Sequence, residues 1–215
     1  MIAILDYGIG NLMSVHKALQ KLGYSSEVTR EPELIMRADA LILPGVGAFG
    51  EAVDFLERSG LVTTVKEFIE GNRPVLGICL GMQILFEESE EAPWARGLSV
   101  LPGIVKRLRF APGPGSPAGR PPKVPHMGWN RVKSKARNVL LDSIPDESYF
   151  YFAHSYYAAP EDPSVVVGET FYGADTGVVM PSVVARGLVF GVQFHPEKSG
   201  DVGLALLRNF GRMAT

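Results

Sequence analysis

The fold is decided by residues 75–86, VLGICLGMQILF. The apolar run Val75 to Ile78 predicts a buried strand, and Leu80 to Phe86 predicts a helix. Cys79 is the only cysteine of the chain and lies at the turn between them, with a glycine two residues to either side. This is the layout of the nucleophile elbow G-x-S-x-G, with sulfur in place of oxygen.

The chemistry of this turn favours a reactive thiol. Gly77 and Gly81 allow the neighbouring backbone to pass too close for a Cβ. The free N–H groups of the following helix favour the thiolate, which is the nucleophilic form of Cys79. The alternative is a buried structural cysteine that behaves as a small hydrophobic residue, and only a nearby general base separates the two interpretations.

The segments before the turn alternate between strands and helices. Strands are predicted at Ile2 to Leu5, Tyr24 to Thr29 (polar enough for an edge) and Ala40 to Leu43, and helices after Asn11, which can cap the first, and at about 49–58 and 61–71. The alternation predicts a mostly parallel, doubly wound α/β sheet.

The second half has a different pattern. Closely spaced strand candidates predict antiparallel strands added to the sheet, and no linker divides the chain, so one domain is expected over residues 1–215. Ile104 to Phe110 is a strand candidate with alternating apolar and basic residues. The closely spaced candidates that come after it are Tyr149 to Tyr157, Ser164 to Phe171, Val178 to Ala185 and Leu188 to Phe194, followed by a helix over Asp201 to Arg212. Between them, Ala111 to Pro122 is rich in proline and glycine and predicts a surface loop.

Composition excludes several classes of function. A net charge of −2 gives no sign of a nucleic-acid or membrane surface, and one cysteine and no signal peptide predict a cytoplasmic protein. No histidine or cysteine spacing predicts a metal site. Gly8-Ile9-Gly10 has Met13 where a dinucleotide loop needs its third glycine, so no nicotinamide cofactor is expected.

The second strong signal is the end of the last strand, where His195-Pro196-Glu197 follows an apolar run. Residues i and i+2 of an extended segment point the same way, so His195 and Glu197 can lie side by side. A thiol needs a general base, and the base needs a carboxylate to orient it. Cys79, His195 and Glu197 supply these roles if the two strand ends are adjacent.

Pro44-Gly45-Val46-Gly47 ends another predicted strand. Its simplest interpretation is an ordinary turn. Beside a nucleophile, its backbone N–H groups can stabilise an oxyanion, and its glycines let a peptide reorient at little steric cost.

Together these motifs resemble the class-I (triad) glutamine amidotransferases, of flavodoxin-like fold. Within that class the chain resembles the glutaminase subunits of imidazole glycerol phosphate synthase. The stretches that carry the narrower resemblance are Asp6-Tyr7-Gly8-x-Gly10-Asn11-Leu12, Pro44-Gly45-Val46-Gly47-Ala48-Phe49, His126-Met127-Gly128-Trp129-Asn130, His154-Ser155-Tyr156-Tyr157 and His195-Pro196-Glu197-Lys198-Ser199. The main departure is residues 111–122, which are longer than the family needs.

The resemblance implies a mechanism and site residues. Cys79 attacks the side-chain amide of glutamine, His195 protonates the departing ammonia, Glu197 orients His195, and water cleaves the glutamyl thioester. The implied oxyanion donors are the backbone of Gly45, Val46 and Gly47 and that of Leu80. The implied glutamine contacts are Gln83, Glu91, His154, Ser155 and Tyr156. No cofactor is implied.

The resemblance also implies a partner, a cyclase subunit with a (β/α)₈ barrel that forms a heterodimer with this chain. The cyclase uses the ammonia to make imidazole glycerol phosphate and aminoimidazole carboxamide ribotide in histidine biosynthesis. The docking rim is expected to include Tyr7, Asn11, Met127, Trp129 and Lys198. Three alternatives stay open: the subunit of another amidotransferase, such as the pyridoxal phosphate or anthranilate type, a free-standing cysteine hydrolase, and a non-enzymatic interaction module.

Overall fold

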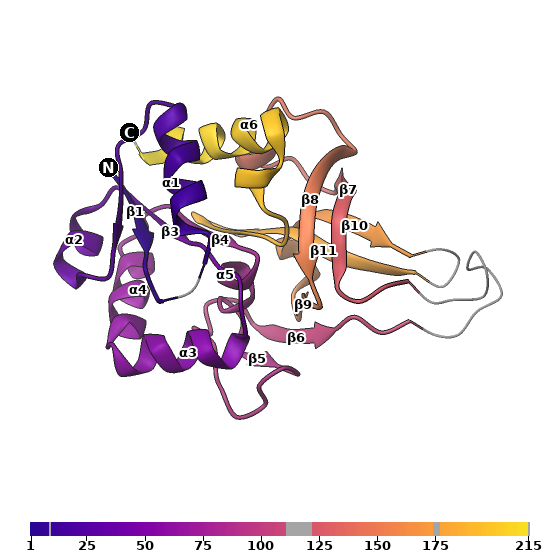
Figure 1. Cartoon of the computed structure of the whole chain (residues 1–215), viewed down its shortest axis with the longest axis horizontal. Coiled ribbons are helices and arrows are strands. Elements are labelled where there is room, and N and C mark those ends of the chain that lie inside the picture. The colour runs from indigo at the N-terminus through magenta and orange to yellow at the C-terminus, as the bar shows by residue number, and fades with distance from the viewer. Residues whose placement is uncertain (9, 111–121, 174–176, 215) are drawn as a thin grey trace.

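The computed structural model describes residues 1–8, 10–110, 122–173 and 177–214. Five parallel strands form one half of a nine-stranded sheet, in the spatial order β2-β1-β3-β4-β12 (Figure 1). They are β1 (Ile2–Leu5), β2 (Ser26–Thr29), β3 (Ala40–Leu43), β4 (Val75–Ile78) and β12 (Val189–Val192). This order is the flavodoxin-like arrangement, and it confirms the predicted doubly wound sheet and the edge position of β2.

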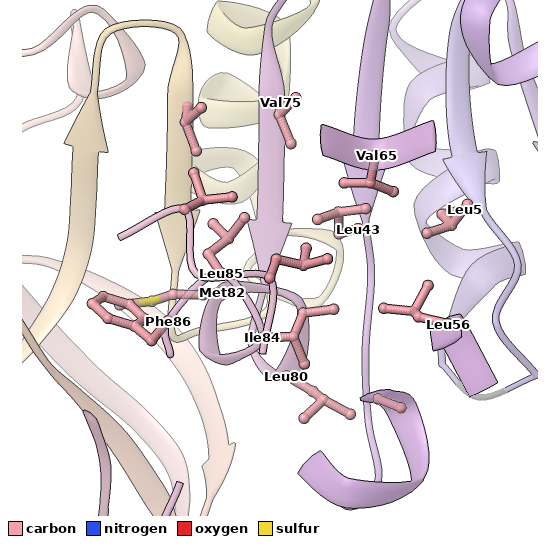
Figure 2. Packing of buried hydrophobic residues seen from close by; sticks show 14 of the residues in the cluster. Leu5, Leu43, Leu56, Val65, Val75, Leu80, Met82, Ile84, Leu85 and Phe86 are labelled. Carbon is pink, nitrogen blue, oxygen red and sulfur yellow. The ribbon is translucent and has the colours of Figure 1, made fainter. Parts of the chain in front are cut away.

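Helices cover both faces of the parallel strands, as Figure 1 shows. Alternate residues of β1 separate two cores: Ile2 and Ile4 belong to one cluster, and Ala3 and Leu5 to the other. The first cluster packs under α1 (Leu12–Lys21) and α6 (Gly200–Gly211). The second, drawn in Figure 2, packs under α2 (Pro32–Arg37), α3 (Phe49–Arg58) and α4 (Leu61–Glu70).

The rest of the large sheet is antiparallel and continues from β12 in the order β11-β10-β7-β8. Its strands are β7 (His126–Ser134), β8 (Ser148–His154), β10 (Val166–Tyr172) and β11 (Val178–Arg186). A second sheet is formed by β5 (Glu88–Ser89), β6 (Gly103–Arg107) and β9 (Tyr156–Pro160). In the part of the chain that the structure describes, the remaining helices are α5 (Leu80–Gln83) and 3₁₀ turns at Val139–Leu141, Pro163–Val165, Pro196–Lys198 and Arg212–Ala214.

Two expectations need correction, and a third falls almost wholly outside the described residues. The helix after Cys79 ends at Gln83 instead of Phe86: the N–H groups of Leu85 (3.2 Å) and Phe86 (3.0 Å) donate to carbonyls three residues back instead of four, so the α-helical pattern does not continue. The stretch expected as one strand over 149–157 is two strands, β8 and β9, in different sheets. The expected surface loop at 111–122 lies outside the described residues except for Pro122.

The strands and helices missed among the described residues include α2, β7 and the two-residue β5. In β7 the apolar residues Met127 and Trp129 point outward and are exposed, whereas His126 points inward and is buried. This reverses the alternation that identifies a strand in sequence. Among the described residues, no helix is long and apolar enough to span a membrane.

Candidate active site

The turn that carries Cys79 is a tight elbow at the C-terminal edge of the parallel sheet. Cys79 has φ +53°, a backbone conformation that residues other than glycine rarely adopt. A Cβ on Gly77 would lie 2.5 Å from the Gly81 carbonyl oxygen, and one on Gly81 would lie 1.7 Å from that of Leu43. Both flanking positions therefore require glycine, as the sequence predicts.

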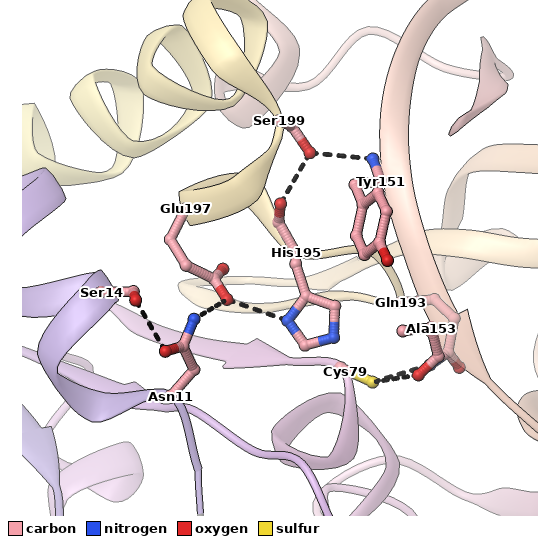
Figure 3. A network of polar contacts seen from close by, with 9 residues as sticks. All are labelled: Asn11, Ser14, Cys79, Tyr151, Ala153, Gln193, His195, Glu197 and Ser199. Carbon is pink, nitrogen blue, oxygen red and sulfur yellow. Dashed lines mark hydrogen bonds and ion pairs between the residues drawn. The ribbon is translucent and has the colours of Figure 1, made fainter. Parts of the chain in front are cut away.

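His195 and Glu197 lie together at the end of β12, next to the elbow. His195 Nδ1 is 2.9 Å from Glu197 Oε1, and both side chains are 1% exposed. In Figure 3 the imidazole lies between the carboxylate and the sulfur of Cys79. The parallel pairing of β12 with β4 brings the two strand ends together, as the interpretation of the two motifs requires.

Asn11 contacts Glu197 and does not cap its helix through its side chain, which corrects one expectation. Its Nδ2 donates to Glu197 Oε1 at 3.2 Å, and its Oδ1 accepts from Ser14 Oγ at 2.6 Å (Figure 3). Asn11 thus orients the carboxylate that orients His195. Sequence reasoning missed this role, because nothing local links residues 186 positions apart.

The charge state of His195 follows from its neighbours. Burial lowers the pKa of His195, but interactions with Cys79 and with Glu197 outweigh burial and raise it to about 10. The buried Nε2 of His195 has no hydrogen-bond partner among the described residues. A thiolate beside an imidazolium is the arrangement that activates a cysteine nucleophile.

The sulfur of Cys79 also contacts the side chain of Gln193, which in turn bonds to Gln83. Gln193 Nε2 lies 3.7 Å from Cys79 Sγ, and Gln83 Nε2 donates to Gln193 Oε1 at 3.3 Å and to the Tyr156 carbonyl at 2.9 Å. These two hydrogen bonds fix the side chain of Gln83 in the wall of the pocket. Sequence reasoning missed Gln193, although it lies only two residues before His195.

A pocket of about 360 Å³ opens over the sulfur. The residues predicted as oxyanion and glutamine contacts line it, except for Gly45, which is buried behind it. The lining residues are Val46, Gly47, Cys79, Leu80, Gln83, Glu91, Pro125, Met127, Ala153, His154, Ser155 and Tyr156. Glu91 also accepts from the N–H of Phe49 at 2.8 Å, which fixes the start of α3.

Two neutral histidines support the pocket wall. The ring nitrogens His126 Nδ1 and His154 Nε2 are 3.1 Å apart, and His154 Nδ1 lies 2.8 Å from the Tyr156 carbonyl oxygen. Burial lowers the pKa of His126 to about 4, and burial together with the adjacent His126 lowers that of His154 to about 3. Both rings are therefore neutral near pH 7, and His154 can donate to the same carbonyl as Gln83.

One of the predicted oxyanion donors is occupied within the chain. The N–H of Leu80 donates to the Gly45 carbonyl at 3.4 Å. That carbonyl belongs to the peptide between Gly45 and Val46, so a rotation of one peptide would release the Leu80 N–H and turn the Val46 N–H over. The glycine at position 45 makes such a rotation inexpensive.

The residues predicted to meet a partner divide into two groups. Met127 and Trp129 are 64% and 55% exposed, and Lys198 is exposed, with its Nζ 5.9 Å from the ring of Tyr151. Trp129 stacks edge-on against Tyr151 at 6.1 Å, so it is a surface residue and not a core one. Tyr7 is 1% exposed, so the expectation that its side chain faces a partner is wrong.

Comparison with known proteins identifies the family to which the chain belongs. The model of the family "Glutamine amidotransferase class-I" matches residues 3–213. "Imidazole glycerol phosphate synthase subunit HisH" of Moorella thermoacetica is 51% identical over 99% of this chain and 94% of its own length. The protein of the same name from Bacillus thuringiensis (strain Al Hakam) is 47% identical over 98% and 93%.

Solved structures agree on the fold at lower identity. A structure described as a glutamine amidotransferase is 20% identical, with TM-score 0.74, and covers 99% of this chain and 98% of that one. A glutamine amidotransferase from Thermotoga maritima is 16% identical, with TM-score 0.63, and covers 99% and 97%. The chain therefore belongs to the class-I glutamine amidotransferases and, among them, to the family of the HisH subunits of imidazole glycerol phosphate synthase.

Proposed function

We propose that this chain is the glutaminase subunit of a two-subunit imidazole glycerol phosphate synthase and that Cys79, His195 and Glu197 form its catalytic triad. The observation that carries the triad is the 2.9 Å contact between His195 and Glu197 beside the elbow of Cys79, under a pocket lined by the predicted glutamine contacts. Family membership carries the rest of the proposal.

The first step is attack of the Cys79 thiolate on the side-chain amide carbon of glutamine. The tetrahedral intermediate collapses when His195 donates its Nε2 proton to the amide nitrogen, and ammonia leaves. Water then attacks the glutamyl thioester, His195 takes a proton from that water, and glutamate is released. Glu197 stabilises the imidazolium in both half-reactions, and Asn11 holds Glu197.

The ammonia passes to a cyclase subunit with a (β/α)₈ barrel, docked on the rim where the parallel strands end. There it enters a ribonucleotide intermediate of histidine synthesis, giving imidazole glycerol phosphate and aminoimidazole carboxamide ribotide. We place the docking surface around Met127, Trp129 and Lys198, which lie on the exposed side of the site. A reaction that depends on a free thiol suits the reducing cytoplasm, where we place it.

Glu197→Gln tests the role of the carboxylate. The amide keeps an acceptor for His195 but removes the charge that stabilises the imidazolium, and a charge-assisted hydrogen bond contributes about 1.5–3 kcal/mol. We expect glutamate release by the chain in complex with the cyclase to fall roughly 10- to 100-fold, with the fold intact. Glu33→Gln, in an exposed pair with Arg37, is the matched control. An unchanged rate would remove Glu197 from the mechanism.

Trp129→Ala tests the docking surface. Aromatic residues are the usual anchors of interfaces, and truncating one costs about 2 kcal/mol or more, so the Kd for the cyclase should rise about 30-fold. Titration of labelled cyclase measures it. Trp94→Ala is the control, because Trp94 is 82% exposed but lies outside the proposed surface. Equal affinities of the two variants would contradict this docking surface.

A further inference from the structure

The hydroxyl of Tyr7 is a buried polar group with no hydrogen-bond partner among the described residues. Tyr7 lies two residues after the end of β1 and packs in the core with Leu43 and Leu80. Buried hydroxyl groups are almost always paired, so an unpaired one calls for a functional explanation. Burial, and then the nearby charge of Cys79, raise the pKa of Tyr7, so the hydroxyl stays protonated and can donate.

This hydroxyl points at Gly45. A Cβ on Gly45 would lie 2.5 Å from the Tyr7 hydroxyl oxygen and 2.7 Å from Leu80 Cβ. With a Cα–Cβ bond of about 1.5 Å, the hydroxyl is within about 4 Å of Gly45 Cα. The carbonyl oxygen of Gly45 is fixed about 2.4 Å from the same Cα. The hydroxyl and the Gly45 carbonyl therefore lie within a few ångströms of the same Cα, and a turn of the Gly45–Val46 peptide moves that carbonyl oxygen relative to a donor that is already close.

We infer that Tyr7 is a positioning residue for the oxyanion hole: its hydroxyl donates to the Gly45 carbonyl when the Gly45–Val46 peptide turns over. The inference rests on the proposed glutaminase function. In the resting arrangement, Leu80 N–H holds the Gly45 carbonyl and the Tyr7 hydroxyl has no acceptor among the residues that the structure describes. In the turned arrangement, Tyr7 holds that carbonyl, and the N–H groups of Leu80 and Val46 are both free to face the substrate.

Because of this exchange, the Tyr7 hydroxyl has opposite effects on the stability of the isolated chain and on turnover. In the resting state its hydroxyl destabilises the chain, because a buried donor goes unpaired. In the turned state it stabilises the catalytically competent peptide. The same atom therefore lowers the stability of the isolated chain and raises turnover, whereas a hydroxyl with a purely structural role would raise stability and leave turnover unchanged.

Tyr7→Phe separates these roles, since it keeps the ring and removes only the hydroxyl. For glutamine hydrolysis by the complex with the cyclase, we expect kcat to fall about three- to tenfold, the effect of one net hydrogen bond, with KM unchanged. Ammonia-dependent synthesis by the same complex should not change. The Tm of the isolated chain should rise by about 2–4 °C.

Tyr24→Phe is the matched control, because the Tyr24 hydroxyl donates to the Arg208 carbonyl at 3.0 Å, far from the site in sequence and fold. It should leave kcat unchanged and should not raise Tm. If Tyr7→Phe lowered Tm, or left kcat at the wild-type value, the inference would be overturned while wild-type glutamate release still supported the glutaminase function. A wild-type complex that released no glutamate would overturn both.

Discussion

Cys79→Ser is expected to abolish glutamine-dependent synthesis by the complex and to leave ammonia-dependent synthesis intact. A serine hydroxyl stays protonated where a thiol beside an imidazolium ionises, so the nucleophile is lost. In serine enzymes, loss of the nucleophile costs a factor of about 10⁶ in kcat, and we expect a fall of at least roughly 10⁴ here. The side chain is nearly isosteric, so the elbow and the cyclase interface are retained.

The two nitrogen sources make this experiment its own control. Ammonia enters the cyclase without Cys79, so its rate reports that the complex is assembled and the cyclase is active. Parallel loss of both rates would indicate damage to the fold or the interface. A serine variant that used glutamine at near the wild-type rate would show that Cys79 is not the nucleophile.

The isolated chain is expected to be a poor glutaminase, and the complex with an acceptor analogue to be about 10²–10³ times faster. In the structure the Leu80 N–H donates to the Gly45 carbonyl, so one predicted oxyanion donor is occupied. Loss of one such donor costs about 2.7–4 kcal/mol of transition-state stabilisation. Binding of partner and acceptor can favour the turned peptide by this amount, which is close to the typical range of coupling between sites.

Glutamate release by the isolated chain, by the complex and by the complex with acceptor analogue measures this coupling. The increase should lie in kcat, because the oxyanion exists only after attack. Equal rates in all three states would exclude the switch. A change confined to KM would move the switch from the Gly45–Val46 peptide to the glutamine pocket.

The elbow could be predicted from sequence because its two glycines mark positions where backbone passes too close for a Cβ. Gly77 and Gly81 are forced by contacts of 2.5 and 1.7 Å that any Cβ would make. The spacing of His195 and Glu197 predicted that they pair, and the structure has them 2.9 Å apart, although Pro196–Lys198 is a 3₁₀ turn and not the extended segment on which that prediction was based. Parallel strands interleaved with helices then placed both motifs at the same edge of the sheet.

What the sequence could not provide depends on contacts between distant segments. The bond from Asn11 to Glu197 and the approach of Tyr7 to Gly45 join separate strand ends. Tyr7 was misjudged because a motif shared with a family does not say whether a side chain faces a partner or the core. β7 was missed because its outward face carries Met127 and Trp129, so its apolar residues mark a surface.

The central claim is that Cys79 carries the glutamyl group. The most direct measurement is mass spectrometry of the complex, mixed with glutamine, quenched in acid within its first turnovers and digested. We predict a glutamyl adduct on the peptide that contains Cys79 in the wild type, and none in Cys79→Ser under the same conditions. An active wild-type complex whose peptide stayed unmodified at every quench time, or an adduct on another residue, would contradict the account.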